Sequence, residues 1–143
     1  MNLKSMLDTQ AGWGMAIVRI SAGIIYIGHG LPKTGWIGER TFEGTVKFVS
    51  SLGFPLPTLF AGLVTAAELL GGLLLILGLL TRVSAFTQVI AMLVAIFLVH
   101  WDNGMFAQGG YQWALLLGAC SAALMVEGAG KGSLDKIIAD KMN

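Results

Sequence analysis

The feature that most constrains the fold is an apolar run over residues 59–80, LFAGLVTAAELLGGLLLILGLL. As a helix this run is about 30 Å long, which matches the hydrocarbon thickness of a lipid bilayer. It carries one carboxylate, Glu68. A charged side chain at that depth costs about 2.5 to 3.5 kcal/mol on insertion scales, so it should face protein or water and have a partner. The run therefore predicts a transmembrane helix with Glu68 at the centre of a candidate site.

The rest of the chain has the composition of an integral membrane protein. Of its 143 residues, 55% are hydrophobic and 12% are charged, whereas about a quarter of the residues in soluble domains are charged. The net charge of +1 offers no basic surface for nucleic acid. The single cysteine, Cys120, excludes an intrachain disulfide and a CxxC redox pair. We therefore expect the chain to contact lipid and not to bind nucleic acid.

Hydrophobic periodicity predicts an all-α fold with four transmembrane helices, over residues 13–30, 58–80, 85–100 and 111–127. Between the first two spans, residues 41–52 predict an interfacial amphipathic helix with Thr41 as its N-cap and Gly53 as its stop. Residues 128–143 form a tail in which Ser133 is placed to cap a short helix. The predicted fold is thus a four-helix membrane bundle that forms a single domain over residues 1–143.

Basic residues predict the orientation of this bundle. Four spans place both termini and the turn after the second span on one side of the membrane. That side carries Lys4, Arg82, Lys131, Lys136 and Lys141. The opposite side has Lys33, Arg40 and Lys47 in its first loop and no Lys or Arg in its second. The positive-inside rule therefore predicts that both termini are cytoplasmic.

The first span carries a polar stripe that faces the second span. The residues on this stripe, at helical spacing, are Arg19, Gly23, Tyr26, Gly30 and Lys33. Small residues permit close helix approach, so we expect Gly23 to pack against Gly71 and Gly72. We then expect Arg19 to pair with Glu68, with Tyr26 and Gln88 satisfying the remaining polar atoms. The alternative is that Arg19 extends to the nearer membrane interface.

Two histidines, His29 and His100, fall at the same predicted depth on the first and third spans. Paired imidazoles on helices can ligate a b-type haem. We favour the simpler interpretation, in which each is an interfacial histidine bonded to a loop or to lipid. With no further histidine and one cysteine, the chain predicts no zinc or iron–sulfur site.

Three segments together resemble the DoxX family of small bacterial membrane proteins: RISAGIIYIGHGLPK, GFPLP and AELLGGLLLILGLLTR. The combination of HGxxK with ExxGGxxLxxGxxTR carries the resemblance. The positions that match are Arg19, His29, Gly30, Lys33, Glu68, Gly71, Gly72 and Arg82. The resemblance implies a four-helix bundle in the bacterial inner membrane. It also implies an association with respiratory-chain oxidoreductases that use quinone.

Three functions agree with this polar set. The first is a membrane subunit of a quinone-linked redox complex, which anchors a partner protein and offers a quinone site formed by Glu68, Arg19, Tyr26, His29 and Lys33. The second is a structural or assembly protein in which the ion pair fixes the helix register. The third is a small proton-coupled transporter with Glu68 as its relay, although the chain has no internal repeat of the kind typical of transporters. A second copy of the chain can cover the apolar perimeter in any of these.

Overall fold

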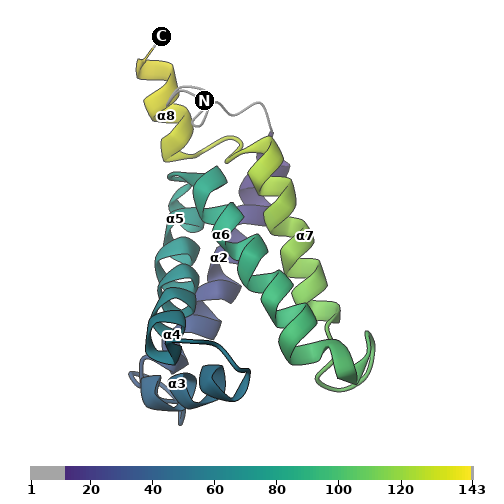
Figure 1. Ribbon diagram of the computed structural model, residues 1–143. Coiled ribbons are helices and arrows are strands. Elements are labelled where there is room, and N and C mark those ends of the chain that lie inside the picture. Colours follow the sequence, from purple (N-terminus) through teal and green to yellow (C-terminus); the bar gives the residue numbers. More distant parts are fainter. Residues whose placement is uncertain (1–11, 143) are drawn as a thin grey trace.

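The computed structural model describes residues 12–142, which form helices joined by turns and contain no strand (Figure 1). Lys4, which contributed to the predicted orientation, lies outside these residues. In chain order the elements are α2 (Trp13–Lys33), α3 (Phe42–Ser51), α4 (Pro57–Ala66), the π-helical turn η1 (Ala67–Gly71), α5 (Gly72–Leu77), α6 (Thr81–Val94), the π-helical turn η2 (Ala95–His100), the 3-10 turn η3 (Trp101–Asn103), α7 (Gln112–Glu127) and α8 (Leu134–Lys141).

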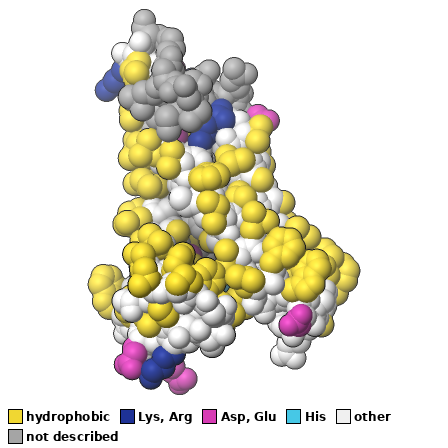
Figure 2. Space-filling model, viewed as in Figure 1, with side chains coloured by type: hydrophobic (Ala, Val, Ile, Leu, Met, Phe, Trp, Pro, Cys, Tyr) yellow, Lys and Arg dark blue, Asp and Glu magenta, His cyan; other side chains and the backbone are white. Residues whose placement is uncertain are grey.

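Three continuous helical segments are long and apolar enough to cross a membrane: Trp13–Lys33, Pro57–Leu77 and Thr81–Asn103. The next helix, α7, is apolar but has only 16 residues. In Figure 2 hydrophobic side chains cover the sides of the molecule, and the charged side chains in view gather toward its two ends. The predicted all-α membrane class is confirmed, whereas the fourth crossing rests on this shorter helix.

Several helix ends differ from the predicted bounds, including that of the second span, which ends at Leu77 rather than at residue 80. The first helix continues beyond residue 30 through Pro32 to Lys33. The third begins at Thr81 rather than at residue 85, because the carboxylate of Asp135 caps it. Its two oxygens accept hydrogen bonds from the backbone N–H groups of Leu80 at 2.7 Å and Thr81 at 2.9 Å. A carboxylate in this position satisfies the free N–H groups of a helix start and complements its dipole.

The two short helices begin where the sequence predicted. Thr41 caps α3, its side chain accepting a hydrogen bond from the N–H of Gly44 at 3.0 Å. Ser133 caps α8 in the same way, through the N–H of Lys136 at 3.3 Å. In Figure 1, α3 and α8 lie at opposite ends of the bundle.

Close contact between α2 and α5 sets the antiparallel register of the first two spans. A Cβ added at Gly23 would lie 2.6 Å from the carbonyl oxygen of Gly72, and one added at Gly72 would lie 2.8 Å from that of Gly23. The predicted glycine contact is therefore confirmed for this pair. The core beside it contains Ala22, Tyr26, Leu75, Ala85, Leu117 and Leu124. Toward the end that carries α3, the α4 side and the α6–α7 side diverge (Figure 1).

Candidate functional site

Glu68 forms an ion pair with Lys33, in the last turn of α2. Both carboxylate oxygens accept hydrogen bonds from Lys33 Nζ at 2.6 Å. The Lys33 and Glu68 side chains are 17% and 7% exposed. A Cβ added at Gly30 would lie 3.0 Å from the Glu68 Cβ, so this glycine allows the two helices to meet at the pair. Mutual neutralisation is what permits both charges to lie inside a transmembrane segment.

The backbone that carries Glu68 is the π-helical turn η1. A π turn departs from the regular pattern of α-helical hydrogen bonds, and such turns occur frequently at functional sites. Two side chains of α6 bind its carbonyl groups. Gln88 Nε2 donates to the carbonyl of Ala67, and Ser84 Oγ donates to that of Gly71, both at 2.7 Å. A Cβ added at Gly71 would lie 2.8 Å from Gln88 Nε2, so Gly71 packs against α6 rather than against α2.

Gln88 has one buried polar atom without a partner among residues 12–142, on the α6 side of the turn that carries Glu68. Its side chain is fully buried. Because Nε2 is bound to the carbonyl of Ala67, the amide orientation is fixed. Within the described part of the chain, Gln88 Oε1 is buried with no hydrogen-bond partner. The π turn therefore carries the ion pair with α2 through Glu68 and contacts, through its other side, a buried acceptor of α6 that is unpaired among the described residues.

The predicted ion pair between Arg19 and Glu68 is wrong. Arg19 is 2% exposed and lies at the other end of α2, where its guanidinium binds backbone carbonyls. Its Nε donates to Ala129 at 3.0 Å and its Nη1 to Leu75 at 3.1 Å. It also donates to the carbonyls of Ile76 and Gly132. Arg19 thus joins the end of α5 to the C-terminal tail, and the quinone site predicted around it is not formed there.

Arg19 belongs to a group of side chains that closes this end of the bundle. Asp135 caps α6, and its own N–H donates to the carbonyl of Gly78 at 2.8 Å. Arg82 donates to the carbonyls of the last residues of α7, including Met125 at 2.9 Å. A cation at a helix C-terminus satisfies free carbonyl groups and complements the dipole. The role of both arginines here is therefore structural.

Tyr26 is 1% exposed and contacts α7 rather than Lys33 or Glu68 through its hydroxyl. The hydroxyl forms a hydrogen bond with Ser121 Oγ at 2.8 Å and donates to the carbonyl of Leu117 at 3.3 Å. A buried phenol whose polar atom is bonded in this way orients two packed helices. Tyr26 therefore fixes α2 against α7 instead of completing the ion-pair site.

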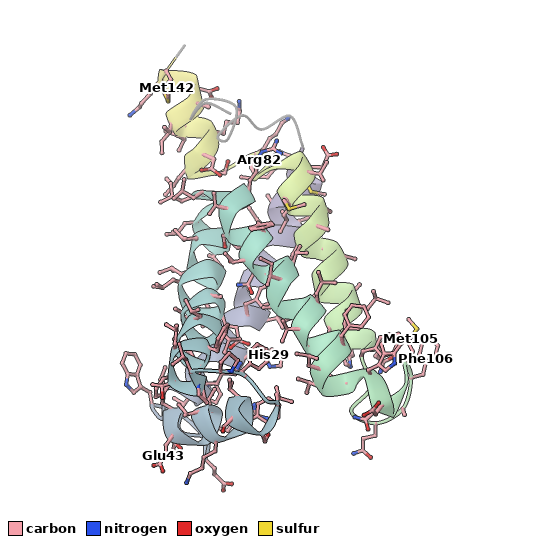
Figure 3. All side chains as sticks on the ribbon, viewed as in Figure 1. His29, Glu43, Arg82, Met105, Phe106 and Met142 are labelled. Atoms are coloured by element: carbon pink, nitrogen blue, oxygen red, sulfur yellow. The ribbon has the colours of Figure 1, made fainter. Side chains whose placement is uncertain are left out.

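His29 and His100 line one cavity of about 620 Å³ at the end of the bundle that carries α3. Its other lining residues include Phe106, Gln108, Gln112 and Trp113. Figure 3 shows His29 between the α4 side and the α6–α7 side, at the same level as Phe106. The bond between His100 Nδ1 and the carbonyl of Gly109, at 2.7 Å, makes Nδ1 the protonated nitrogen and leaves Nε2 as an acceptor. No group of three or more His, Cys, Asp or Glu side chains that could hold a metal ion occurs within residues 12–142.

The predicted site residues thus lie in separate places. Lys33 pairs with Glu68, and Gln88 binds the carbonyl of Ala67 in the same turn. Tyr26 lies in the core toward α7, His29 lines the cavity, and Arg19 lies in the closure at the opposite end. Sequence reasoning also missed Ser84. The signal for it was its spacing from Gln88, because residues four apart lie on one face of a helix.

With this geometry established, the chain can be compared with known proteins. The profile of the DoxX family matches residues 14–101, a range that contains all of α2 except Trp13 and includes the Lys33–Glu68 pair. This chain belongs to the DoxX family. It is similar to the putative oxidoreductase CatD of Bacillus subtilis, with 32% identity over 111 residues that cover 78% of each protein.

Two further relatives extend the comparison. An uncharacterized protein of Haemophilus influenzae is 31% identical over 133 residues, which cover 90% of this chain and 85% of the relative. The inner membrane protein YphA of Escherichia coli is 37% identical over 68 residues, which cover 48% of this chain and 45% of YphA. No solved structure matches this chain. The predicted membership of the DoxX family is confirmed, and this chain is a membrane protein.

Proposed function

We propose that this chain is an integral membrane subunit of a quinone-linked redox complex, and that Lys33 and Glu68 exchange protons with the bound quinone. The family relationship supports a redox role, because CatD is named a putative oxidoreductase. The name of YphA supports placement in the bacterial inner membrane. In this proposal α7 supplies a fourth crossing, and both termini lie on the cytoplasmic side.

The observation that carries the proposal is the buried Lys33–Glu68 pair on the π-helical turn η1. Reduction of a quinone to a quinol takes two electrons and two protons. In this proposal the ammonium of Lys33 supplies one proton to a quinone carbonyl oxygen. The second proton comes from water and passes through the carboxyl group of Glu68 to the other oxygen, and water then returns a proton to Lys33. A general acid acts over hydrogen-bond distance, directly or through one water molecule, so a quinone carbonyl group must lie within that reach of the pair.

The electrons come from a partner protein in this proposal. One cysteine and two histidines cannot supply the four ligands of an iron–sulfur cluster within a single chain. The chain therefore anchors a partner that carries the redox cofactor, as in a respiratory-chain complex. We also still predict that a second copy of the chain can contact the apolar perimeter of the bundle in the bilayer.

The test compares variants of the buried pair in the intact complex. We would purify the tagged chain from its native membrane in mild detergent, identify the copurifying redox protein, and measure electron transfer from it to a short-chain benzoquinone. We expect Glu68→Gln and Lys33→Met each to lower the turnover number at least tenfold while the partner still copurifies. The matched control is Lys47→Met, since Lys47 and Glu43 form an ion pair in which both side chains are more than three-quarters exposed.

The double variant Lys33→Met with Glu68→Leu separates a working pair from a structural one. Replacing both buried charges with apolar groups can preserve or raise stability. We expect this variant to assemble and to remain inactive. The proposal is wrong if the double variant regains full turnover, because the pair would then serve only to fix the helix register. It is also wrong if the native complex contains no redox partner and reduces no quinone.

A further inference from the structure

The cavity beside His29 is built from segments that are distant in sequence. Its lining comes from α2 through His29, from η2 through His100, from the following loop through Gln108, and from α7 through Gln112 and Trp113. Polar groups that converge on an apolar cavity from separate elements are the usual form of a small-molecule site. The volume of about 620 Å³ lies within the range of such sites, about 300 to 1,000 Å³.

The polar groups of this cavity suit a ligand with hydrogen-bond acceptors at both ends. The amides of Gln108 and Gln112 can each donate, and so can His29 in the appropriate tautomer. His100 is oriented by its bond to the carbonyl of Gly109. His29 comes from α2 and Gln112 from α7, so donors reach this cavity from two different helices. A flat ring with a carbonyl group at each end can be bound between these two donors.

The apolar part of the lining suits an aromatic ring. Trp113 is 68% exposed and Phe106 is 78% exposed, so both present ring faces that the protein itself does not cover. Aromatic side chains stack favourably on conjugated rings. Ile25, one helical turn before His29 on the same face of α2, is exposed and apolar, so an alkyl tail can lie along this face.

The cavity adjoins the ion pair through α2. His29 and Lys33 are four residues apart, so they lie on the same face of α2, about 6 Å apart along its axis. A ligand held at His29 is therefore one helical turn from the ammonium that binds Glu68. We infer that this cavity binds the ring of a quinone, with His29 and Gln112 holding opposite carbonyl groups. This inference rests on the proposed function and assigns its ring-binding site.

The experiment uses the full-length chain in lipid nanodiscs with a short-chain azidobenzoquinone as the probe. Binding is followed by quenching of tryptophan fluorescence, and the photolabelled peptide is identified by mass spectrometry. We expect label on residues 100–114 or on the segment that contains His29. We expect His29→Leu and Gln112→Leu each to raise the dissociation constant at least tenfold without changing the thermal midpoint. The control is Thr58→Leu, an exposed residue at the same end of the bundle and outside this cavity.

The outcomes separate this inference from the proposed function. If the probe binds tightly to both variants and labels another segment, the cavity is not the ring site, while a quinone-linked function still stands. If the wild-type chain and its complex show no saturable binding, both proposals are wrong. If the purified chain instead contains haem, with an absorption spectrum that is lost in His29→Leu, then the cavity holds a metal cofactor and the assignment of a quinone is overturned.

Discussion

Replacing Arg19 with methionine should detach the C-terminal tail and destabilise the protein by roughly 3 to 5 kcal/mol. The guanidinium is the donor for the carbonyls of Ala129, Ile76 and Gly132. It also binds Leu75, but that carbonyl keeps a hydrogen bond from the N–H of Gly78. Each of the three carbonyls left unpaired costs about 1 to 3 kcal/mol, and loss of the desolvated cation offsets part of the sum.

The assay is equilibrium unfolding in mixed micelles followed by circular dichroism, together with hydrogen exchange of residues 128–142. We expect the N–H of Asp135, which is bonded to the carbonyl of Gly78, to exchange faster in Arg19→Met. The free energy of unfolding of Arg19→Lys should lie between those of the wild type and Arg19→Met, because an ammonium lacks the planar fork that reaches several carbonyls at once. Arg40→Met is the control, since Arg40 is exposed in a loop. A free energy of unfolding within about 1 kcal/mol of wild type, with unchanged exchange in the tail, would refute this reasoning.

Three further substitutions test other contacts. Gly23→Ala should lower the free energy of unfolding by about 2 kcal/mol or more, because the added Cβ would meet the opposing backbone. Gly28 has open space around it, so Gly28→Ala should be neutral or stabilising in the same unfolding assay. Asp135→Asn should lower the free energy of unfolding by about 1 to 2 kcal/mol, because it weakens the cap of α6. Asp140 is exposed, so Asp140→Asn should leave the free energy of unfolding almost unchanged. Equal effects of the two substitutions would contradict the capping role of Asp135. Tyr26→Phe should lower the free energy of unfolding by about 1 to 2 kcal/mol, because the Ser121 hydroxyl on α7 loses its partner. An unchanged thermal midpoint would show that the Tyr26 hydroxyl does not contribute.

The membrane class, the glycine contact and both capped short helices were predictable because each depends on local pattern. Hydropathy over a span, small residues on a stripe and a capping side chain are all visible along the sequence. The start of α6 at Thr81 could not be predicted from local sequence, because the residue that caps it, Asp135, is 54 residues away from Thr81. The π turn at Glu68 was also missed, because its carbonyl partners come from another helix.

The wrong partner for Glu68 follows from the register that the sequence did predict. When Gly23 faces Gly72 in an antiparallel pair, residue 19 faces residue 76 and residue 68 faces residue 27. Arg19 and Glu68 are then separated by about 12 Å along the helix axis, whereas Arg19 lies beside the carbonyl of Ile76. Lys33 was on the same predicted stripe and nearer to Glu68. We did not predict it as the partner because the first helix was expected to end at residue 30, which placed Lys33 at the membrane surface. In the structure α2 continues through Pro32 to Lys33.

The most direct test of the central claim is an infrared difference spectrum of the chain with bound quinone, recorded as the quinone is reduced electrochemically in nanodiscs. If Glu68 exchanges a proton with the quinone, a carboxyl band should change on reduction. The change should disappear in Glu68→Gln and persist in Glu43→Gln, whose carboxylate is exposed on α3. A spectrum with no carboxyl change, or with the same change in Glu68→Gln, would contradict the proposed role of the buried pair.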